Sequence, residues 1–240
     1  MSSAAAYLLG PVEFDSALAL QQRLVYEASG DPSGPVTLLL CEHPPLVTIG
    51  RQGSRGDVQM SDEELEQLRL STRWVNRGGG TIVHLSGQLA IYPVVAVDMQ
   101  GWSVGEYLDR LHQGLQHALT ELGVATQTKP DRAGLWGRTG LLAAVGVAVR
   151  TGVSYFGAYI NVDARMPLVR RVLSDPIGRQ PMSSLNVERR QPVRMPALRE
   201  AVVRHLATAL GAERYHLHSR HPLFARHTTV VHPGTTARAG

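Results

Sequence analysis

Residues 75–93, VNRGGGTIVHLSGQLAIYP, place an arginine and three consecutive glycines directly before an apolar run that contains one histidine. Glycine has no Cβ, so its backbone reaches positive φ and lets a ligand or another backbone approach closely. Arg77 could bind an anion, and His84 could form a hydrogen bond or transfer a proton. The alternative interpretation is a bulged strand with a structural histidine. The stretch by itself leaves both interpretations open.

Two kinds of apolar periodicity surround this stretch. Helical spacing predicts helices over residues 12–28, 61–68, 104–122 and 196–210. Compact apolar runs predict strands over residues 36–43, 46–51, 72–84, 87–97, 133–137, 141–150 and 153–162. The helices and strands follow one another without strict alternation, which indicates an α+β fold.

The length and composition of the chain limit the number of domains that it can form. With 240 residues, 43% of them hydrophobic and 18% charged, residues 1–212 are predicted to form one domain, and residues 213–240 a partly disordered C-terminal extension. The apolar runs are much shorter than the ~20 residues of a membrane span. The N-terminus lacks the basic segment of a signal peptide, which predicts a cytoplasmic protein.

The polar residues exclude several kinds of site. Cys41 is the single cysteine, which rules out an internal disulfide and a cysteine-based metal site within one chain. The histidines at position 43 and within residues 216–221 lack a carboxylate or cysteine that would complete a ligand set, so neither a metal nor a cofactor is predicted. The net charge is +4, and arginines gather at residues 165–171 and 187–194. They form either a solvated surface or a surface for an acidic partner. The sequence has no basic stripe with interleaved aromatic residues, so nucleic-acid binding is not predicted.

Two further segments could belong to a site. The small residues of 141–150 could line a narrow apolar channel, and residues 153–162 place Gly157 and Ala158 between aromatic residues; ordinary core packing is the alternative. Asp175, which precedes a proline, could be a carboxylate at a site or a turn former.

Four blocks of the sequence occur together in a distinctive order. They are CEHPPLVTIGR (41–51), RGGGTIVHLSGQLAIYP (77–93), AGLWGRTGLLAAVGVAVRTGVSYFGAYINV (133–162) and DPIGRQPMSSL (175–185). In order and spacing they resemble the octanoyltransferases of protein lipoylation, the lipoate-protein ligase B group of the biotin/lipoate ligase superfamily. The resemblance covers about residues 7–210. It implies one α+β domain with a mixed sheet flanked by helices and a narrow acyl tunnel.

The resemblance also implies an activity. Members of that family move an octanoyl group from acyl carrier protein to a lysine on a lipoyl domain, through a thioester on an enzyme cysteine that a nearby lysine activates. The partners it implies are octanoyl-acyl carrier protein and the lipoyl domains of 2-oxoacid dehydrogenases or the glycine cleavage H protein. The substrate-binding residues it implies are Arg77, Gly78, Gly79, Gly80, Thr81, Ile82, Val83, His84, Ala144, Val145, Gly146, Gly157, Ala158 and Tyr159.

Three positions depart from the family pattern. Leu141 stands where the family has its lysine, and Phe156 replaces the histidine before Gly157. Counting back from Leu185 without a gap places Asp175 at the position of the nucleophilic cysteine. The residues for thioester catalysis are therefore substituted.

Two hypotheses remain open for such a chain. In the first, Asp175 acts as a general base for the target lysine, and the octanoyl group moves directly. In the second, the chain is a catalytically silent homologue that binds an octanoyl or lipoyl group, or a lipoyl domain. Cys41 is expected to be buried as a small hydrophobe, and Lys129, the only lysine, to lie on a loop. Ligation with ATP is disfavoured because those relatives also use a lysine near position 141.

Overall fold

The main sheet of the protein is mixed and has eight strands. The computed structural model describes residues 3–130, 132–175 and 180–224. The strand order is β11-β1-β2-β6-β10-β9-β8-β7, in which β1 is parallel to both neighbours and the other pairs are antiparallel. The bounds are β1 Ser3–Pro11, β2 Val36–Glu42, β6 Gln88–Val94, β7 Gln127–Lys129, β8 Arg132–Gly137, β9 Gly140–Arg150, β10 Val153–Asn161 and β11 Arg214–His218.

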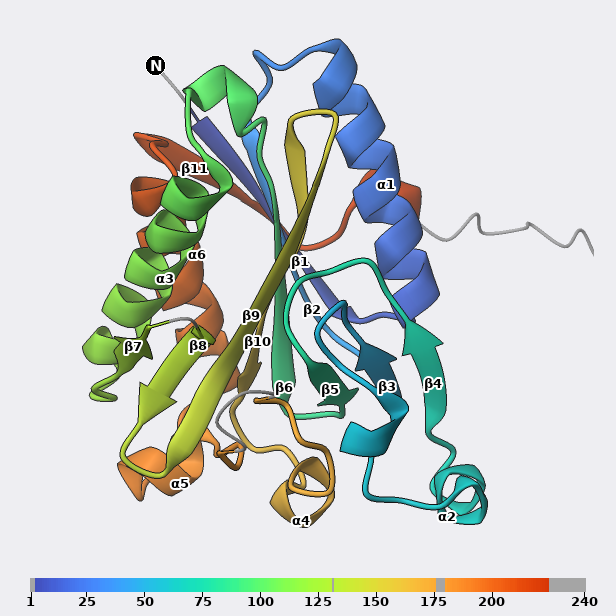
Figure 1. The fold of residues 1–240 in the computed structure, drawn as a ribbon. Coiled ribbons are helices and arrows are strands. Elements are labelled where there is room, and N and C mark those ends of the chain that lie inside the picture. Colours follow the sequence, from blue (N-terminus) through green and yellow to red (C-terminus); the bar gives the residue numbers. More distant parts are fainter. Residues whose placement is uncertain (1–2, 131, 176–179, 225–240) are drawn as a thin grey trace, which may run out of the picture.

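A second, three-stranded sheet lies beside one end of the main sheet (Figure 1). It has the order β4-β3-β5, with bounds β3 Leu46–Ile49, β4 Ser71–Trp74 and β5 Thr81–His84. β3 pairs with β4 in parallel and with β5 in antiparallel fashion. The glycine-rich segment, residues 75–80, joins β4 to β5, so it lies where the two sheets meet.

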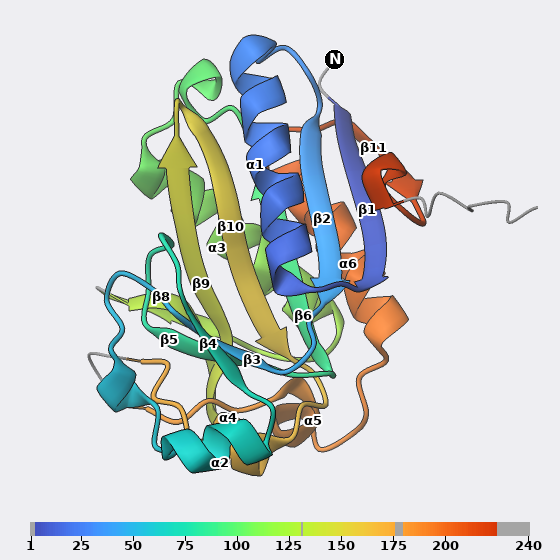
Figure 2. The same ribbon diagram turned by 90° about the vertical axis from the view of Figure 1, so that its right-hand side faces the viewer.

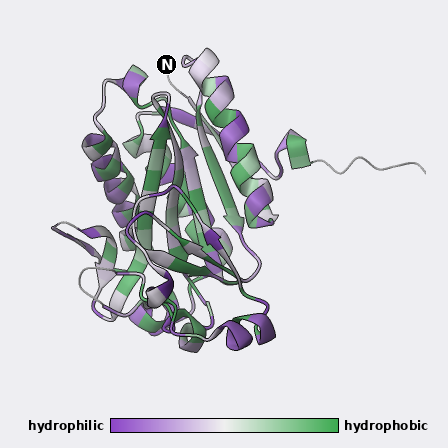
Figure 3. Ribbon diagram, turned by 45° about the vertical axis from the view of Figure 1, so that its right-hand side comes forward, coloured by the Kyte–Doolittle hydropathy of each residue, from purple (hydrophilic) through white to green (hydrophobic). Residues whose placement is uncertain are grey.

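Helices cover both faces of the main sheet. Helices α3 (Val104–Glu121) and α6 (Met195–Ala209) lie together on one face, and α1 (Phe14–Gly30) lies on the other, as Figure 2 shows. Hydrophobic residues concentrate in the sheets and in the inward faces of the helices (Figure 3). The buried apolar side chains form one cluster on the α3/α6 side and a second that includes α1 and the small sheet. The short helices α2 (Asp62–Gln67), α4 (Met166–Val169) and α5 (Leu185–Arg189) lie at the end where the small sheet is.

The α+β fold, with a mixed sheet flanked by helices, confirms the expectation from sequence. All four predicted helices are present, and the capping box at α2 forms through mutual hydrogen bonds of Ser61 and Glu64. Among the described residues, no helix is long and apolar enough to cross a bilayer.

Three strand predictions need correction. The strand predicted over residues 46–51 covers only Leu46–Ile49, and it lies in the small sheet rather than in the main sheet with the strand before it. Residues 72–84 form two strands with the glycine-rich segment between them. β1 was not predicted at all. These errors share a cause: the partner of a strand, rather than its local pattern, decides which sheet it joins.

The C-terminal part of the described chain adds an edge strand to the sheet. Residues 214–218 of the predicted extension form β11, which runs parallel to β1. His218 stacks on Tyr7, with ring centroids 4.8 Å apart, and the tilted ring of His221 contacts Tyr7 at 4.6 Å. Residues 225–240, the remainder of the extension that was predicted to be partly disordered, lie outside the described residues.

Candidate functional site

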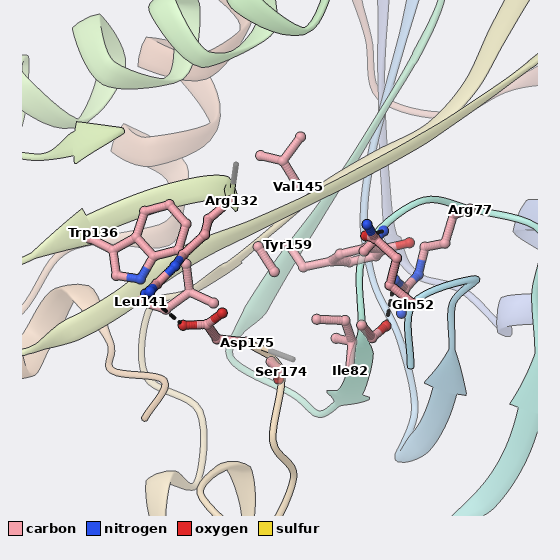
Figure 4. A pocket seen from close by; sticks show the side chains of 13 residues that line it. Gln52, Arg77, Ile82, Arg132, Trp136, Leu141, Val145, Tyr159, Ser174 and Asp175 are labelled. Atoms are coloured by element: carbon pink, nitrogen blue, oxygen red, sulfur yellow. Dashed lines mark hydrogen bonds and ion pairs between the residues drawn. The ribbon is translucent and has the colours of Figure 1, made fainter. Parts of the chain in front are cut away.

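A small cavity lies between the main sheet, the glycine-rich segment and the chain that follows α4 (Figure 4). Its volume is about 30 Å³, which is room for roughly one or two water molecules. The lining residues are Gln52, Arg77, Gly79, Gly80, Ile82, Arg132, Trp136, Leu141, Ala144, Val145, Tyr159, Ser174 and Asp175. We call this cavity the pocket.

A larger groove continues from the pocket. Gln52, Gly79, Arg132 and Val145 line both. The groove has a volume of about 630 Å³ and runs along β9 to the first turn of α3. Its walls include the apolar side chains of Val104, Leu108, Val145 and Val147. The groove, rather than the enclosed pocket, has the volume for a chain of several methylene groups.

The structure brings together part of the predicted site. The predicted residues that line the pocket are Arg77, Gly79, Gly80, Ile82, Ala144, Val145, Tyr159 and Asp175. Gly78 and Gly146 line only the adjoining groove. The predicted residues that line neither are Thr81, Val83, His84, Gly157 and Ala158.

The glycines let the glycine-rich segment lie directly on β9. Gly78 N donates a hydrogen bond to Val147 O at 2.9 Å. A Cβ on Gly146 would lie 2.3 Å from Gly78 O, much closer than real Cβ atoms come. The absence of a side chain at Gly146 is therefore a packing requirement: it lets the glycine-rich segment lie on β9 and places Arg77 beside the pocket.

Arg77 is a buried cation, 1% exposed. Its NH1 donates to the carbonyls of Gly78 and Gly80 at 3.0 and 2.9 Å. Its NH2 donates to the carbonyl and the hydroxyl of Thr48 at 3.1 and 2.9 Å. Burial lowers the pKa of the guanidinium from its usual value, but an arginine stays protonated at any physiological pH.

A chain of buried hydrogen bonds extends from Thr48 through His84. His84 Nε2 lies 2.9 Å from Thr48 Oγ1, and His84 Nδ1 lies 3.0 Å from Gln88 Oε1. Gln88 Nε2 donates to Val83 O and to Asn161 Oδ1, and Asn161 Nδ2 donates to Ser183 O. Since Gln88 Oε1 can only accept, His84 Nδ1 carries the proton and Nε2 accepts from Thr48.

His84 is therefore a neutral, structural histidine. Burial lowers its pKa well below the usual value, and the nearby His43 and Arg77 lower it further. Its ring packs edge-on against Tyr159, at 4.8 Å between centroids, and both side chains are fully buried. His84 supports the pocket through Thr48 and Tyr159 rather than facing a substrate.

Cys41 lies on β2, fully buried and away from the pocket. Burial raises the pKa of its thiol far above the usual value. A thiol that stays protonated and inaccessible is a poor nucleophile. The expectation that Cys41 is a buried small hydrophobe is confirmed.

His43, two residues further on, is a second buried histidine, and we predict that it makes folding pH-dependent. Its Nδ1 donates to Val12 O at 2.7 Å, so its Nε2 accepts from the Tyr92 hydroxyl at 2.6 Å. Burial lowers its pKa to about 4, against about 6.5 in the unfolded chain. Between these values the unfolded state binds more protons, so stability falls as the pH falls from 6.5 to 4.

The expected loss from His43 is about 2 kcal/mol between pH 7 and pH 5. Urea unfolding at the two pH values measures it. His43→Gln keeps a donor and an acceptor of similar reach but does not titrate, so its loss should be smaller by about that amount. Equal losses in the two proteins would contradict this assignment.

Asp175 and Leu141, the two positions that depart most from the family pattern, meet in the pocket. Residues 181–183 run alongside the start of β9, where Leu141 N donates to Pro181 O and Ser183 N donates to Leu141 O. Asp175 is 3% exposed, and its carboxylate lies 3.3 Å from Arg132 NH1. The pocket thus holds a buried carboxylate beside a cation.

Lys129 lies closer to the pocket than expected. It ends β7 rather than occupying a loop, and it lines the groove. Its Nζ lies 5.4 Å from the centroid of the Trp136 ring and bonds to Gln180 Oε1. The antiparallel pairing of β7 with β8, which the sequence did not indicate, brings it there.

Several pocket residues escaped the sequence analysis. They are Gln52, Arg132, Trp136 and Ser174. Trp136 had a signal, because a large aromatic residue stands between glycines in AGLWG, a segment of the block that resembles the family. Gln52, Arg132 and Ser174 have no local signal, since only the fold brings their segments together.

The pocket contains more polar groups than the protein itself uses. Arg77 Nε, Trp136 Nε1, Tyr159 Oη and Ser174 Oγ are buried and have no hydrogen-bond partner among the described residues. Two of them are N–H donors and two are hydroxyls. A pocket of this composition can bind a small group that accepts hydrogen bonds, such as a carbonyl oxygen.

Comparison with known proteins places the chain in a family. Residues 14–207 match the lipoyl protein ligase A/B catalytic domain. An octanoyltransferase of Geobacter metallireducens is 37% identical over 81% of this chain and 87% of its own length. The chain belongs to the octanoyltransferase family. An octanoyltransferase of Geobacter sulfurreducens, 31% identical over 96% of this chain and 94% of its own, agrees.

Solved structures share the fold of this octanoyltransferase-family chain. A lipoate-protein ligase A bound with ATP superposes with a TM-score of 0.71, over 92% of this chain and 90% of its own, at 15% identity. A biotin protein ligase of Aquifex aeolicus in complex with biotin and ATP gives a TM-score of 0.52, over 86% and 70%, at 12% identity. The relatives give the catalytically silent alternative no support.

Proposed function

We propose that this octanoyltransferase-family chain transfers an octanoyl group from octanoyl-acyl carrier protein to a lysine of a lipoyl domain. The supporting observation is the groove, walled in part by apolar side chains, that adjoins a pocket holding the buried carboxylate of Asp175 and unused hydrogen-bond donors. The groove would hold the acyl chain and the pocket the thioester carbonyl. Lipoyl domains of 2-oxoacid dehydrogenases or the glycine cleavage H protein would supply the lysine.

The chemistry proposed for this pocket is direct transfer, because Cys41 is buried outside it. The lysine nitrogen attacks the thioester carbon, and a C–N bond forms. The nitrogen becomes cationic and acidic, and the Asp175 carboxylate accepts its proton. The C–S bond then breaks, and the thiolate of the carrier takes that proton. The products are an octanoyl amide and a free carrier thiol, so atoms and charge balance.

Transfer in solution tests the proposal. The protein is incubated with octanoyl-acyl carrier protein and an apo lipoyl domain, and the intact mass of each component is followed. The octanoyl mass should move to the lipoyl domain without appearing on this chain, at the same rate in Cys41→Ser. The absence of transfer would refute the function, and an octanoyl adduct on this chain would refute the direct route.

A further inference from the structure

We infer that the Nε–H of Arg77 is the donor that binds the acyl carbonyl oxygen and stabilises the oxyanion formed during transfer. The inference rests on the proposed function and assigns a catalytic group within it. It follows from a count of donors. A guanidinium has five N–H groups, and four of them are used by Gly78, Gly80 and Thr48. The fifth, on Nε, is buried and has no partner in the described chain.

Within the described part of the chain, the charge of Arg77 has no counterion. No described carboxylate forms an ion pair with this side chain, and its acceptors are carbonyls and one hydroxyl. The Tyr159 ring, whose centroid lies 5.6 Å from the guanidinium carbon, attracts the cation but carries no full negative charge. Burying an unpaired cation is unfavourable. A negative charge that develops on a substrate oxygen would compensate it, so the interaction is stronger in the transition state than in the ground state.

The donor is also held rigidly. Thr48 accepts from Arg77 NH2 and donates to His84, whose other nitrogen is fixed by Gln88. Asn161 completes the chain by accepting from Gln88 and donating to Ser183 O. A charged donor that needs no reorganisation at the moment of reaction is what oxyanion stabilisation requires. Thr48, His84 and Gln88 are therefore positioning residues.

The size of the pocket agrees with this role. A cavity of about 30 Å³ takes a single oxygen-sized group rather than an alkyl chain. Gly79 and Val145 line both the pocket and the groove, so a carbonyl in the pocket can be continuous with an acyl chain in the groove. Tyr159 Oη and Trp136 Nε1 are further unused donors on the same pocket.

The inference is tested by the kinetics of Arg77→Lys. This substitution keeps the positive charge but removes the guanidinium and its Nε–H donor. The kcat for octanoyl transfer should fall by about 100-fold or more, as when one oxyanion donor is removed, and this fall should be larger than the accompanying rise in KM. A kcat near that of the wild type in a folded Arg77→Lys protein would overturn the inference.

Thr48 variants keep the test decisive if Arg77→Lys does not fold. Thr48→Val has the same shape but leaves Arg77 NH2 short of one acceptor, so kcat should fall by about 10-fold. Thr48→Ser retains the hydroxyl and should restore kcat almost fully. Equal kcat in Thr48→Val and Thr48→Ser would count against the positioning chain.

Binding without turnover separates this inference from the proposed function. Two unreactive carriers are compared: one with an amide-linked octanoyl group, which has a carbonyl, and one with an S-octyl thioether, which has none. The wild type should prefer the amide, and Arg77→Lys and Thr48→Val should lose that preference while binding the thioether unchanged. Absence of transfer by the wild type would refute the proposed function but would leave this binding comparison valid. If both variants still preferred the amide carrier, Arg77 would not be the group that binds the carbonyl.

Discussion

Asp175→Asn is expected to lower the rate of octanoyl transfer by about 100-fold or more, the usual contribution of a positioned general base. The carboxylate is 3% exposed and lines the pocket together with Tyr159 and Arg77. Asparagine has nearly the same shape but cannot accept the proton of the attacking lysine. Single-turnover transfer to an apo lipoyl domain measures the effect, and thermal unfolding checks that the variant is folded.

Arg132→Gln is the matched control for Asp175→Asn. The Arg132 NH1–Asp175 Oδ2 distance is 3.3 Å, so either substitution breaks this ion pair, but only one removes the carboxylate. If the carboxylate accepts the proton, Arg132→Gln should retain most of the rate. An equal loss in both variants would mean that the ion pair, rather than proton transfer, matters. Undiminished transfer by Asp175→Asn would exclude the general-base role.

Gly146→Ala is expected to abolish most transfer and to destabilise the fold by about 1–3 kcal/mol, the usual cost of forcing an extra carbon into a packed interior. The new Cβ would lie 2.3 Å from Gly78 O and 3.5 Å from Arg77 NH1. The glycine-rich segment would have to move off β9, which would break the bond from Gly78 N to Val147 O. Arg77 would move with it.

Gly30→Ala is the matched control for Gly146→Ala, because it adds the same methyl group at a position with free space. Gly30 ends α1, and a Cβ there would meet nothing within 4 Å. The stability of this variant should be equal to or slightly above that of the wild type, since alanine favours a helix more than glycine does. Urea unfolding and the transfer assay are run on both variants. Wild-type behaviour of Gly146→Ala would show that the contact with Gly78 is dispensable.

The amino-acid sequence alone was enough to predict the class of fold, the family and one wall of the site. Helical and strand periodicities are local, so the four long helical segments and the α+β class could be read from them. The RGGG segment signalled a close approach because glycine is the residue that permits one. That signal was sound: the glycines contact β9 and place Arg77 at the pocket.

The roles of the polar residues, in contrast, depend on the folded arrangement of the chain. Ser174 reaches the pocket beside the pairing of Val172 with Val58, which is distant in sequence, whereas Lys129 and Arg132 reach the site through the pairing of β7 with β8. His84 and Cys41 looked chemically versatile, yet burial lowers the pKa of one and raises that of the other, which leaves both neutral. The physical reason is the same in each case: periodicity depends on neighbours in the chain, whereas hydrogen-bond partners and desolvation depend on neighbours in space.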